Sequence, residues 1–470
     1  MFRALSVCAL LFTLPLLCRA DDKPEPTETV IRLKVQPAPA PKPALRYQLL
    51  PEYRELNPGN TAQAYLICFM EQSNFFFSKE AMENRQKWET MPLKELPLKE
   101  LSQFGYGKLK SGALSQADYA ARLDTVDWQV LVKLKRDGVK FLIPEVQWMR
   151  LLGLSLKIRF RVEVAERRFD DALVTAKTIF ALAHHLEDYP LAISALVGES
   201  IAFLAISPLQ EMLEQPGCPN LYWALTNLPK PLVNLRKGLQ TERMMLANVF
   251  DVLDETAPMT EAQLQTAVDR IRELIKDTNG LPWLKEDVGK WLAARVKDEA
   301  RLRAGRRRLV DFGLPEETVK KFPPLQIVLL DDKVATQIWF DDALKAMPLP
   351  YWEAEPFLMK RMPPRGTEEE SLFIGLTSNF RALRQTEARL AQRFALLTCV
   401  EALRMHAAEH GGKLPAQLAD IKLPLPVDPV TGKPFVYKLD GDTATLRGTP
   451  PKGLETAATY NVRYEVTIGK

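Results

Sequence analysis

Cysteine is scarce in this chain, and its few cysteines lie far apart. Five are present, of which Cys8 and Cys18 fall in the apolar N-terminal segment. The other three, Cys68, Cys218 and Cys399, are odd in number and widely spaced, which excludes a disulfide framework. One bridge between two of them stays possible if the chain is exported. We otherwise expect three small, buried apolar side chains.

A strong excess of either charge is also lacking. The chain has 63 Lys and Arg residues against 59 Asp and Glu residues, for a formal net charge of +4. Loss of an N-terminal leader that contains Arg3 and Arg19 would lower this charge from +4 to +2. Such a balance gives no indication of nucleic acid or of an acidic surface as a partner.

Several enzyme motifs are missing as well. The sequence has no glycine-rich phosphate loop, no zinc-ribbon spacing and no dinucleotide fingerprint. The stretch Gly198–Ala202 has the first glycine and the serine of a nucleophile elbow, but it lacks the second glycine and a preceding strand. We expect Ser200 to lie inside an apolar helix.

The N-terminal segment has the pattern of a secretory signal peptide. A basic residue precedes an apolar run from Ala4 to Leu17, and Cys18 and Ala20 occupy the minus-three and minus-one positions of a plausible cleavage site. The apolar run is about 14 residues and contains a proline, whereas a spanning helix needs about 20 residues. We therefore predict a signal peptide over residues 1–20 and an exported protein, either periplasmic or extracellular.

A proline-rich segment follows the leader. Between Asp21 and Ala44 the prolines include an alternating run from Pro37 to Pro43, and few residues there are apolar. Such a composition predicts a semi-extended linker over residues 21–46. Folded sequence is expected to begin near Tyr47.

From residue 47 to residue 347 the pattern is helical, with apolar residues three and four positions apart. Two helix starts resemble capping boxes, one formed by Ser115 with Asp118 and one by Thr260 with Gln263. The apolar run from Leu191 to Leu209 contains a glutamate at its centre, which is costly inside a bilayer. We expect a buried core helix there, and no transmembrane span after signal cleavage.

Within this body, the stretch from Leu156 to Pro190 alternates small and aromatic residues on helical faces around the corner Arg167–Asp171. It resembles a degenerate tetratricopeptide unit, a family whose helix pairs stack into solenoids. The resemblance implies antiparallel helix pairs and a helical-repeat-like body. The fold class is therefore predicted to be mainly α.

The last part of the chain changes character. A connecting loop is expected over residues 348–366. Thr367 and Glu370 then resemble a capping box at the start of a long helix, which Gly411 and Gly412 end near His410. Alternating apolar residues on either side of an Asp-Gly turn indicate strands beyond it. Residues 367–470 are thus predicted to form a small α+β module, a long helix plus a β-meander.

Two resemblances bear on this architecture. The segment from Val400 to Leu446, with its corners at His410–Pro415 and Pro426–Pro429, resembles the C-terminal region of a type II secretion pseudopilin. Further stretches, together with the same tail, resemble uncharacterised exported proteins of planctomycete bacteria: Pro43–Pro51, Asn57–Asn60, Asn220–Leu225 and Leu228–Pro229. These resemblances imply export and a local fold, and no activity comes with them.

The sharpest catalytic candidate is the stretch from His406 to His410. These two histidines lie four residues apart on one helical face and could bind zinc, with Glu409 as a base, as in an H-x-x-E-H metallopeptidase. A third ligand is needed, and the only later glutamates, Glu455 and Glu465, fall in strand and turn sequence. Histidine at a helix C-terminus is also favoured by the dipole alone. We expect no metal, catalytic or cofactor site here.

An exported, non-enzymatic interaction or structural protein of the cell envelope is the predicted function, with an unidentified protein partner. The aromatic run Phe75–Phe77 could line a sugar-binding groove, although aromatic residues at helical spacing are more typical of a core. Two alternatives stay open. One is a zinc-dependent hydrolase that uses His406 and His410, and the other is an accessory of a secretion or pilus-like assembly.

Overall fold

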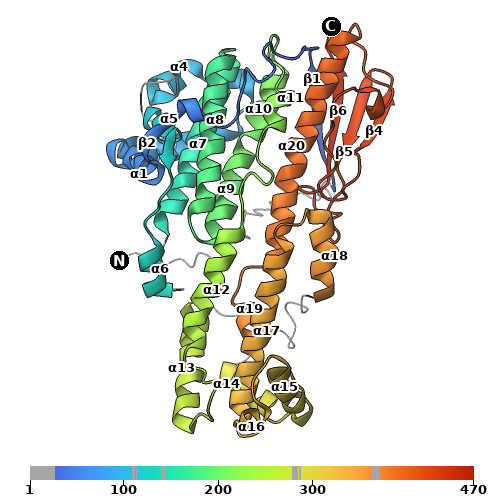
Figure 1. The fold of residues 1–470 in the computed structure, drawn as a ribbon. Coiled ribbons are helices and arrows are strands. Elements are labelled where there is room, and N and C mark those ends of the chain that lie inside the picture. Colours follow the sequence, from blue (N-terminus) through green and yellow to red (C-terminus); the bar gives the residue numbers. More distant parts are fainter. Residues whose placement is uncertain are drawn as a thin grey trace, which may run out of the picture.

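The computed structural model describes residues 27–469, apart from residues 108–111, 113, 139–140, 142, 278–283, 285–286 and 362–370. The predicted leader at residues 1–20 and the predicted capping box of Thr367 and Glu370 lie outside the described residues. The described chain is mainly α-helical with a small sheet near its C-terminal end, which confirms the predicted fold class. Figure 1 shows an elongated molecule with the sheet near one end and an arm of helices at the other.

Short helices build the N-terminal part of the body. The helices are α1 (Thr61–Glu71), α2 (Ser73–Phe77), α3 (Lys79–Thr90), α4 (Leu98–Leu101), α5 (Ser115–Ala120) and α6 (Leu131–Asp137). Two short strands, β2 (Asn57–Asn60) and β3 (Leu123–Thr125), pair in parallel, so that the segment before α1 lies beside the segment after α5.

The start of α5 differs from the prediction. Leu114 precedes this helix and makes no side-chain cap, so the capping box expected of Ser115 with Asp118 is wrong. The Asp118 carboxylate instead accepts hydrogen bonds from the buried Arg159 guanidinium, at 2.6 and 2.9 Å, and from the Thr178 hydroxyl. A charge-assisted bond to a buried arginine is stronger than a neutral capping bond, so the side chain turns inward.

Longer helices form the centre of the body. They are α7 (Pro144–Ala165), α8 (Phe169–His185), α9 (Ala192–Leu204) and α10 (Ile206–Leu213). The first two are joined by a corner of three residues and pack along each other, as the predicted helix pair requires. Whether this pair belongs to a repeat array stays a prediction. A Cβ at Gly198 would lie 2.6 Å from the Ala183 carbonyl oxygen, so glycine there lets α9 approach α8 closely.

One stretch, Ala192–Leu213, is long and apolar enough to cross a membrane by length and composition. Within the protein it forms α9 and α10, and 67% of its most apolar window is buried. Its central Glu199 is 1% exposed and faces the interior of the protein. A buried core helix passes the same test of length and hydropathy as a membrane span.

An arm of helices extends from the body, seen at the bottom of Figure 1. Its elements, with the short helices that connect it to the rest, are α11 (Tyr222–Thr226), α12 (Arg236–Phe250), α13 (Glu261–Asp277), α14 (Val288–Val296), α15 (Glu299–Asp311), α16 (Glu316–Val319), α17 (Pro324–Ala346), α18 (Tyr351–Arg361) and α19 (Leu372–Gly375). The predicted capping box of Thr260 and Gln263 is confirmed, because each side chain accepts a hydrogen bond from the backbone N–H of the other.

The expected connecting loop at residues 348–366 is partly helical. Helix α18 occupies Tyr351–Arg361 and contains Pro356 in its interior. Prolines dominate this stretch and predict a loop. Pro348 and Pro350 lie before the helix, whereas Pro356 removes one backbone N–H donor from the helix interior, which propensity alone does not predict. The described part of the tail then continues with the long helix α20 (Phe380–Glu409), which begins after Asn379 rather than at Thr367.

The C-terminal sheet contains a strand that the sequence analysis placed in a linker. Its order is β1-β6-β5-β4, with β4 (Val436–Asp440), β5 (Thr443–Arg447) and β6 (Val462–Ile468) forming the predicted meander. Strand β1 (Thr29–Val35) lies parallel to β6 along its whole length. The linker predicted over residues 21–46 is therefore wrong for this stretch, and folded sequence begins well before Tyr47.

A buried arginine joins the N-terminal segment to the tail and the body. Arg404 of α20 is 1% exposed and donates to the carbonyl oxygens of Gln36 at 3.0 Å and Cys218 at 2.8 Å. It also forms an ion pair of 2.7 Å with the buried Glu401. Asn220 adds a hydrogen bond to the Glu401 carbonyl oxygen. Three segments distant in sequence thus share one polar core, so the tail is not a separate domain.

All three described cysteines are buried, and none of them forms a disulfide. Burial raises the pKa of each thiol, at Cys68, Cys218 and Cys399, to about 12. A thiol with such a pKa carries little thiolate at neutral pH and is unreactive. The expectation of small buried side chains is confirmed for these residues.

Candidate functional site

The predicted histidine pair lies at the C-terminal end of α20. The imidazole rings of His406 and His410 stack with their centroids 3.8 Å apart and their planes 10° apart. His410 Nδ1 lies 2.8 Å from the His406 carbonyl oxygen, so that nitrogen caps the end of the helix. Partial burial and the neighbouring His410 lower the pKa of His406, which favours neutral imidazole.

This arrangement differs from a zinc site in its geometry. A histidine ligand binds metal in the plane of its ring, about 2 Å from the nitrogen. Two nearly parallel rings separated by 3.8 Å cannot both direct an in-plane lone pair at one ion. Among the residues that the structure describes, no group of three or more histidine, cysteine or acidic side chains is placed to hold a metal. Glu409, the candidate base, ends the helix and is exposed.

The serine of the partial nucleophile elbow lies where the helix was expected. Ser200 is in the middle of α9, next to the buried Glu199. No strand precedes this helix, so the sharp turn that exposes a nucleophile is missing at this position. Ser200 is therefore part of a packed helix.

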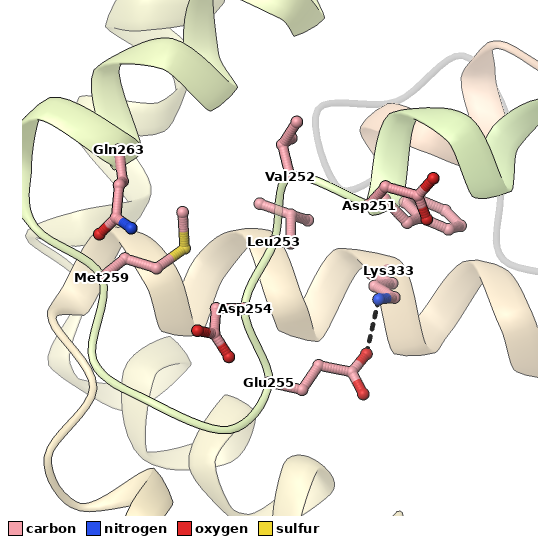
Figure 2. Close-up of a pocket in the computed structure, with 9 residues that line it drawn as sticks. Asp251, Val252, Leu253, Asp254, Glu255, Met259, Gln263 and Lys333 are labelled. Atoms are coloured by element: carbon pink, nitrogen blue, oxygen red, sulfur yellow. Dashed lines mark ion pairs between the residues drawn. The ribbon is translucent and has the colours of Figure 1, made fainter.

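A cavity lies in the arm, between the loop after α12, the start of α13 and the middle of α17 (Figure 2). Its volume is about 540 Å³, and it is open to solvent. It is lined by Phe250, Asp251, Val252, Leu253, Asp254, Glu255, Met259, Gln263 and Lys333. None of these nine residues is a serine, cysteine or histidine.

Charged side chains dominate the polar part of this cavity. Lys333 of α17 is 9% exposed, and its ammonium group forms an ion pair of 2.6 Å with Glu255, as Figure 2 shows. Asp254 accepts hydrogen bonds from the hydroxyl and N–H of Thr256, and these bonds lower the pKa of its carboxyl group. With Asp251, the cavity has three carboxylates against one ammonium group, which suits a cationic group of a partner better than an anionic one.

The loop that forms this cavity is held in place by a buried amide. Gln326 of α17 is fully buried and accepts a hydrogen bond from the Met259 N–H at 2.9 Å. Its amide nitrogen donates to the carbonyl oxygens of Asp254 at 2.7 Å and Ala257 at 2.9 Å. Three bonds from one side chain fix the loop backbone, so the cavity is formed before any ligand arrives.

An exposed group of apolar side chains, which we call the aromatic patch, covers part of the N-terminal helices. Its centre is the ring pair of Phe77 on α2 and Trp148 on α7, which are 40% and 37% exposed. Ile67 and Met70 on α1, the helix that contains Phe69, are counted with it and are 37% and 79% exposed. The rings of Phe77 and Trp148 are 5.9 Å apart, and both contact the buried Phe69.

The aromatic run Phe75–Phe77 thus divides between two roles. Phe76 is fully buried, as a core residue should be, whereas Phe77 is on the surface. The sequence analysis missed the aromatic patch because its members come from three helices separated by up to about 80 positions in the chain. The spacing of Ile67 and Met70, one turn apart on the same helix, was the only local signal of an exposed apolar face.

Comparison of the chain with protein families, with characterised proteins and with solved structures finds no match. Function is therefore argued from the residues themselves. The observations that carry most weight are the aromatic patch, the preformed cavity of the arm and the buried ionic contacts that hold the body together.

Proposed function

We propose that the protein is an exported, non-enzymatic interaction or structural protein of the cell envelope, which presents a rigid helical surface to a protein partner. The aromatic patch is the observation that carries this proposal. Large exposed apolar groups in contact with one another mark interaction sites more often than single exposed residues do. Tryptophan and its aromatic neighbours also contribute a large share of the binding energy in known interfaces.

The packing of the helices that carry the aromatic patch supports the same conclusion. Arg161 of α7 is 3% exposed and forms an ion pair of 2.7 Å with Glu211 of α10. Its guanidinium also donates to the Trp88 carbonyl oxygen at 2.8 Å and to the Met91 carbonyl oxygen. These bonds connect α3, α7 and α10. Nearer Phe77, Arg85 of α3 donates to the Phe76 carbonyl oxygen of α2 at 2.6 Å and to the Ser155 hydroxyl of α7 at 3.0 Å, so α2, α3 and α7 are held in one arrangement. A surface that needs no ordering on binding loses less free energy to entropy.

The cavity of the arm fits this function as a second contact surface. It is open, it is held in shape by Gln326, and its carboxylates outnumber its single ammonium group. Its lining residues include no nucleophile with a neighbouring base, which a hydrolase would need. A basic side chain of a partner would complement it.

The proposal is tested with a photo-crosslinking amino acid placed at Trp148 in cells that make the protein. We expect one discrete cross-linked product from the envelope fraction. The same amino acid at Phe312, an exposed aromatic position that ends α15 on the arm, is the control and should not give that product. Cross-linking that is absent at both positions, or identical at both, would refute a role of the aromatic patch in partner binding.

A second variant separates binding from folding. Phe77→Ser removes a ring that is 40% exposed and contacts Phe69, Phe76 and Trp148, so it should lower the free energy of unfolding by about 1–2 kcal/mol and leave the protein folded. It should also abolish the cross-linked product formed from position 148. A fully folded variant that still gives this product would show that Phe77 does not belong to the contact.

A further inference from the structure

Another cavity lies where three distant segments meet, at the corner between α7 and α8. Its volume is about 370 Å³. The N-terminal segment contributes Arg46 and Tyr47, the corner contributes residues 167–171, and the loop after α10 contributes Gly217 and Pro219. The sequence analysis noted this corner for its helix pairing and assigned no ligand to it.

The backbone of the corner has an unusual residue at its left-handed position. The N–H of Arg168 donates to the Glu163 carbonyl oxygen at 2.9 Å, and the N–H of Arg167 donates to the Val164 carbonyl oxygen at 3.0 Å. This pair of bonds is a Schellman motif at the end of α7. Its left-handed residue is usually glycine, but here it is Arg167, with a φ of 56°.

Arg167 thus occupies a position at which glycine, which has no side chain, would remove backbone strain. Residues held in strained backbone conformations are frequent at functional sites. Arg167 is exposed, and its guanidinium forms no hydrogen bond or ion pair with any residue that the structure describes. No polar contact within the described residues therefore accounts for an arginine at this position.

The other charges of the cavity leave a second arginine unpaired. Arg46 lies over the ring of Tyr47, 5.3 Å from its centroid, and makes no ion pair within the described part of the chain. Arg168 is occupied, since it binds Asp171 at 2.5 Å and Glu166 at 2.7 Å. Asp170 and Asp171, in the first turn of α8, also line the cavity, and Asp171 is paired with Arg168. The helix N-terminus is therefore not offered as the anion site, and the case for a ligand depends on Arg46 and Arg167, whose two positive charges exceed the one negative charge of Asp170.

We propose that this cavity binds a compact oxyanion, phosphate or sulfate, between the guanidinium groups of Arg46 and Arg167. A guanidinium donates two parallel N–H groups to the oxygens of such an anion, and its charge does not depend on pH in the physiological range. The anion is either a free ion or the phosphate of a lipid headgroup. Binding would draw the N-terminal segment onto the helix pair, an effect that goes beyond contact with a protein partner.

The test uses the full mature chain and two variants, with calorimetric titration of inorganic phosphate against a chloride control of equal ionic strength. Arg167→Gly should raise the thermal midpoint, because glycine adopts the left-handed conformation without strain. The same variant should bind phosphate about tenfold or more weakly, since charge-assisted hydrogen bonds are lost. Arg46→Gln should weaken binding to a similar degree. Arg307→Gln, which removes an exposed charge on the arm, should bind as the wild type does.

Two outcomes would overturn the proposal. One is a wild-type protein that takes up phosphate no better than chloride. The other is an Arg167→Gly variant that keeps wild-type affinity for phosphate, whatever its stability. A second arm uses phosphatidylglycerol vesicles: retention that is lost in Arg46→Gln assigns the site to a lipid headgroup, and phosphate binding without retention assigns it to a free ion.

Discussion

Glu199 offers the sharpest test of how this core is stabilised. It lies in the middle of α9, it is 1% exposed, and neither of its carboxyl oxygens has a hydrogen-bond partner among the residues that the structure describes. Burial and the neighbouring Glu387 raise the pKa of the Glu199 carboxyl well above its ordinary value, and the attraction of Arg389 and Arg384 offsets this only in part. The group is therefore held as a neutral acid in the folded protein.

This raised pKa makes stability depend on pH with a definite sign. In the unfolded chain the carboxyl loses its proton as the pH rises past its ordinary value of 4.5, whereas in the folded chain it keeps the proton. The unfolded state alone gains charge and solvation, so the free energy of unfolding falls by about 1.4 kcal/mol per pH unit above that point. The fall continues until the pH reaches the raised pKa of the folded state. Between about pH 5 and pH 8 it amounts to at most about 4 kcal/mol.

Two substitutions at Glu199 separate the effect of its ionisation from the effect of its unpaired carboxyl oxygens. Glu199→Gln cannot ionise, so its free energy of unfolding should depend less on pH than that of the wild type over this range. Glu199→Met also removes the two unpaired oxygens, and it should stabilise the protein at neutral pH by about 1–3 kcal/mol. Urea unfolding at about pH 5 and pH 8 measures the change in pH dependence and the change in stability. Subtracting the wild-type values from those of each variant removes the contributions of other buried acids.

Glu353→Gln serves as the control, because Glu353 is an exposed glutamate on α18 and its loss should leave the pH dependence unchanged. The reasoning is refuted if Glu199→Gln keeps the full wild-type pH dependence. It is also refuted if Glu199→Met lowers the free energy of unfolding by more than about 1 kcal/mol, because the carboxyl would then make a favourable contact that its surroundings do not suggest.

Three further changes have expected outcomes. Arg404→Met should lower the free energy of unfolding by about 3–5 kcal/mol in urea titration, because it leaves the buried Glu401 without its partner, whereas the double variant with Glu401→Leu should recover part of the loss. Thr260→Ala should cost about 1 kcal/mol in the same assay, through loss of the cap on α13. Metal analysis of the purified protein should find no stoichiometric zinc, and His406→Ala should leave the metal content unchanged; one zinc per chain that is lost in this variant would favour the hydrolase.

The helical body could be predicted because its signals are local. Apolar spacing marks the helices, and the Thr260 cap occurs as the sequence indicates, since both partners face solvent and have no competing contact. The Ser115 cap fails because its partner, Asp118, is taken by a buried arginine of another helix. Local propensity is overridden where a tertiary contact offers more free energy.

Strand β1 lies in a proline-rich stretch whose composition predicts a linker. Its buried residues, Leu33 and Val35, alternate with exposed Arg32 and Lys34, which is the pattern of a half-buried strand. The pattern is short and lies in proline-rich sequence, and its partner β6 is more than 400 positions away. Nothing local indicates that β6 is the partner of β1, so the composition alone predicts a linker.

The candidate sites were hidden for a related reason. The aromatic patch joins α1, α2 and α7, and the cavity of the arm joins a loop to α17, so each exists only through tertiary packing. Sequence singled out His406 and His410 instead, because their spacing is local and visible. The stacking of their rings is set by side-chain conformation, which spacing does not determine.

The position of β1 also makes the C-terminal sheet depend on residues near the start of the described chain. In this sheet β6 has strand neighbours on both sides, and the Gly469 N–H donates to the Val35 carbonyl oxygen just beyond the paired register. A tail without residues 29–35 would leave the backbone groups of β6 unpaired and its apolar face open, a template for pairing with another chain. Strands β1 and β6 are more than 400 positions apart, which gives the sheet contacts of very large sequence separation and makes it slow to form. Strand β1 therefore stays without this neighbour until the chain as far as β6 has been made.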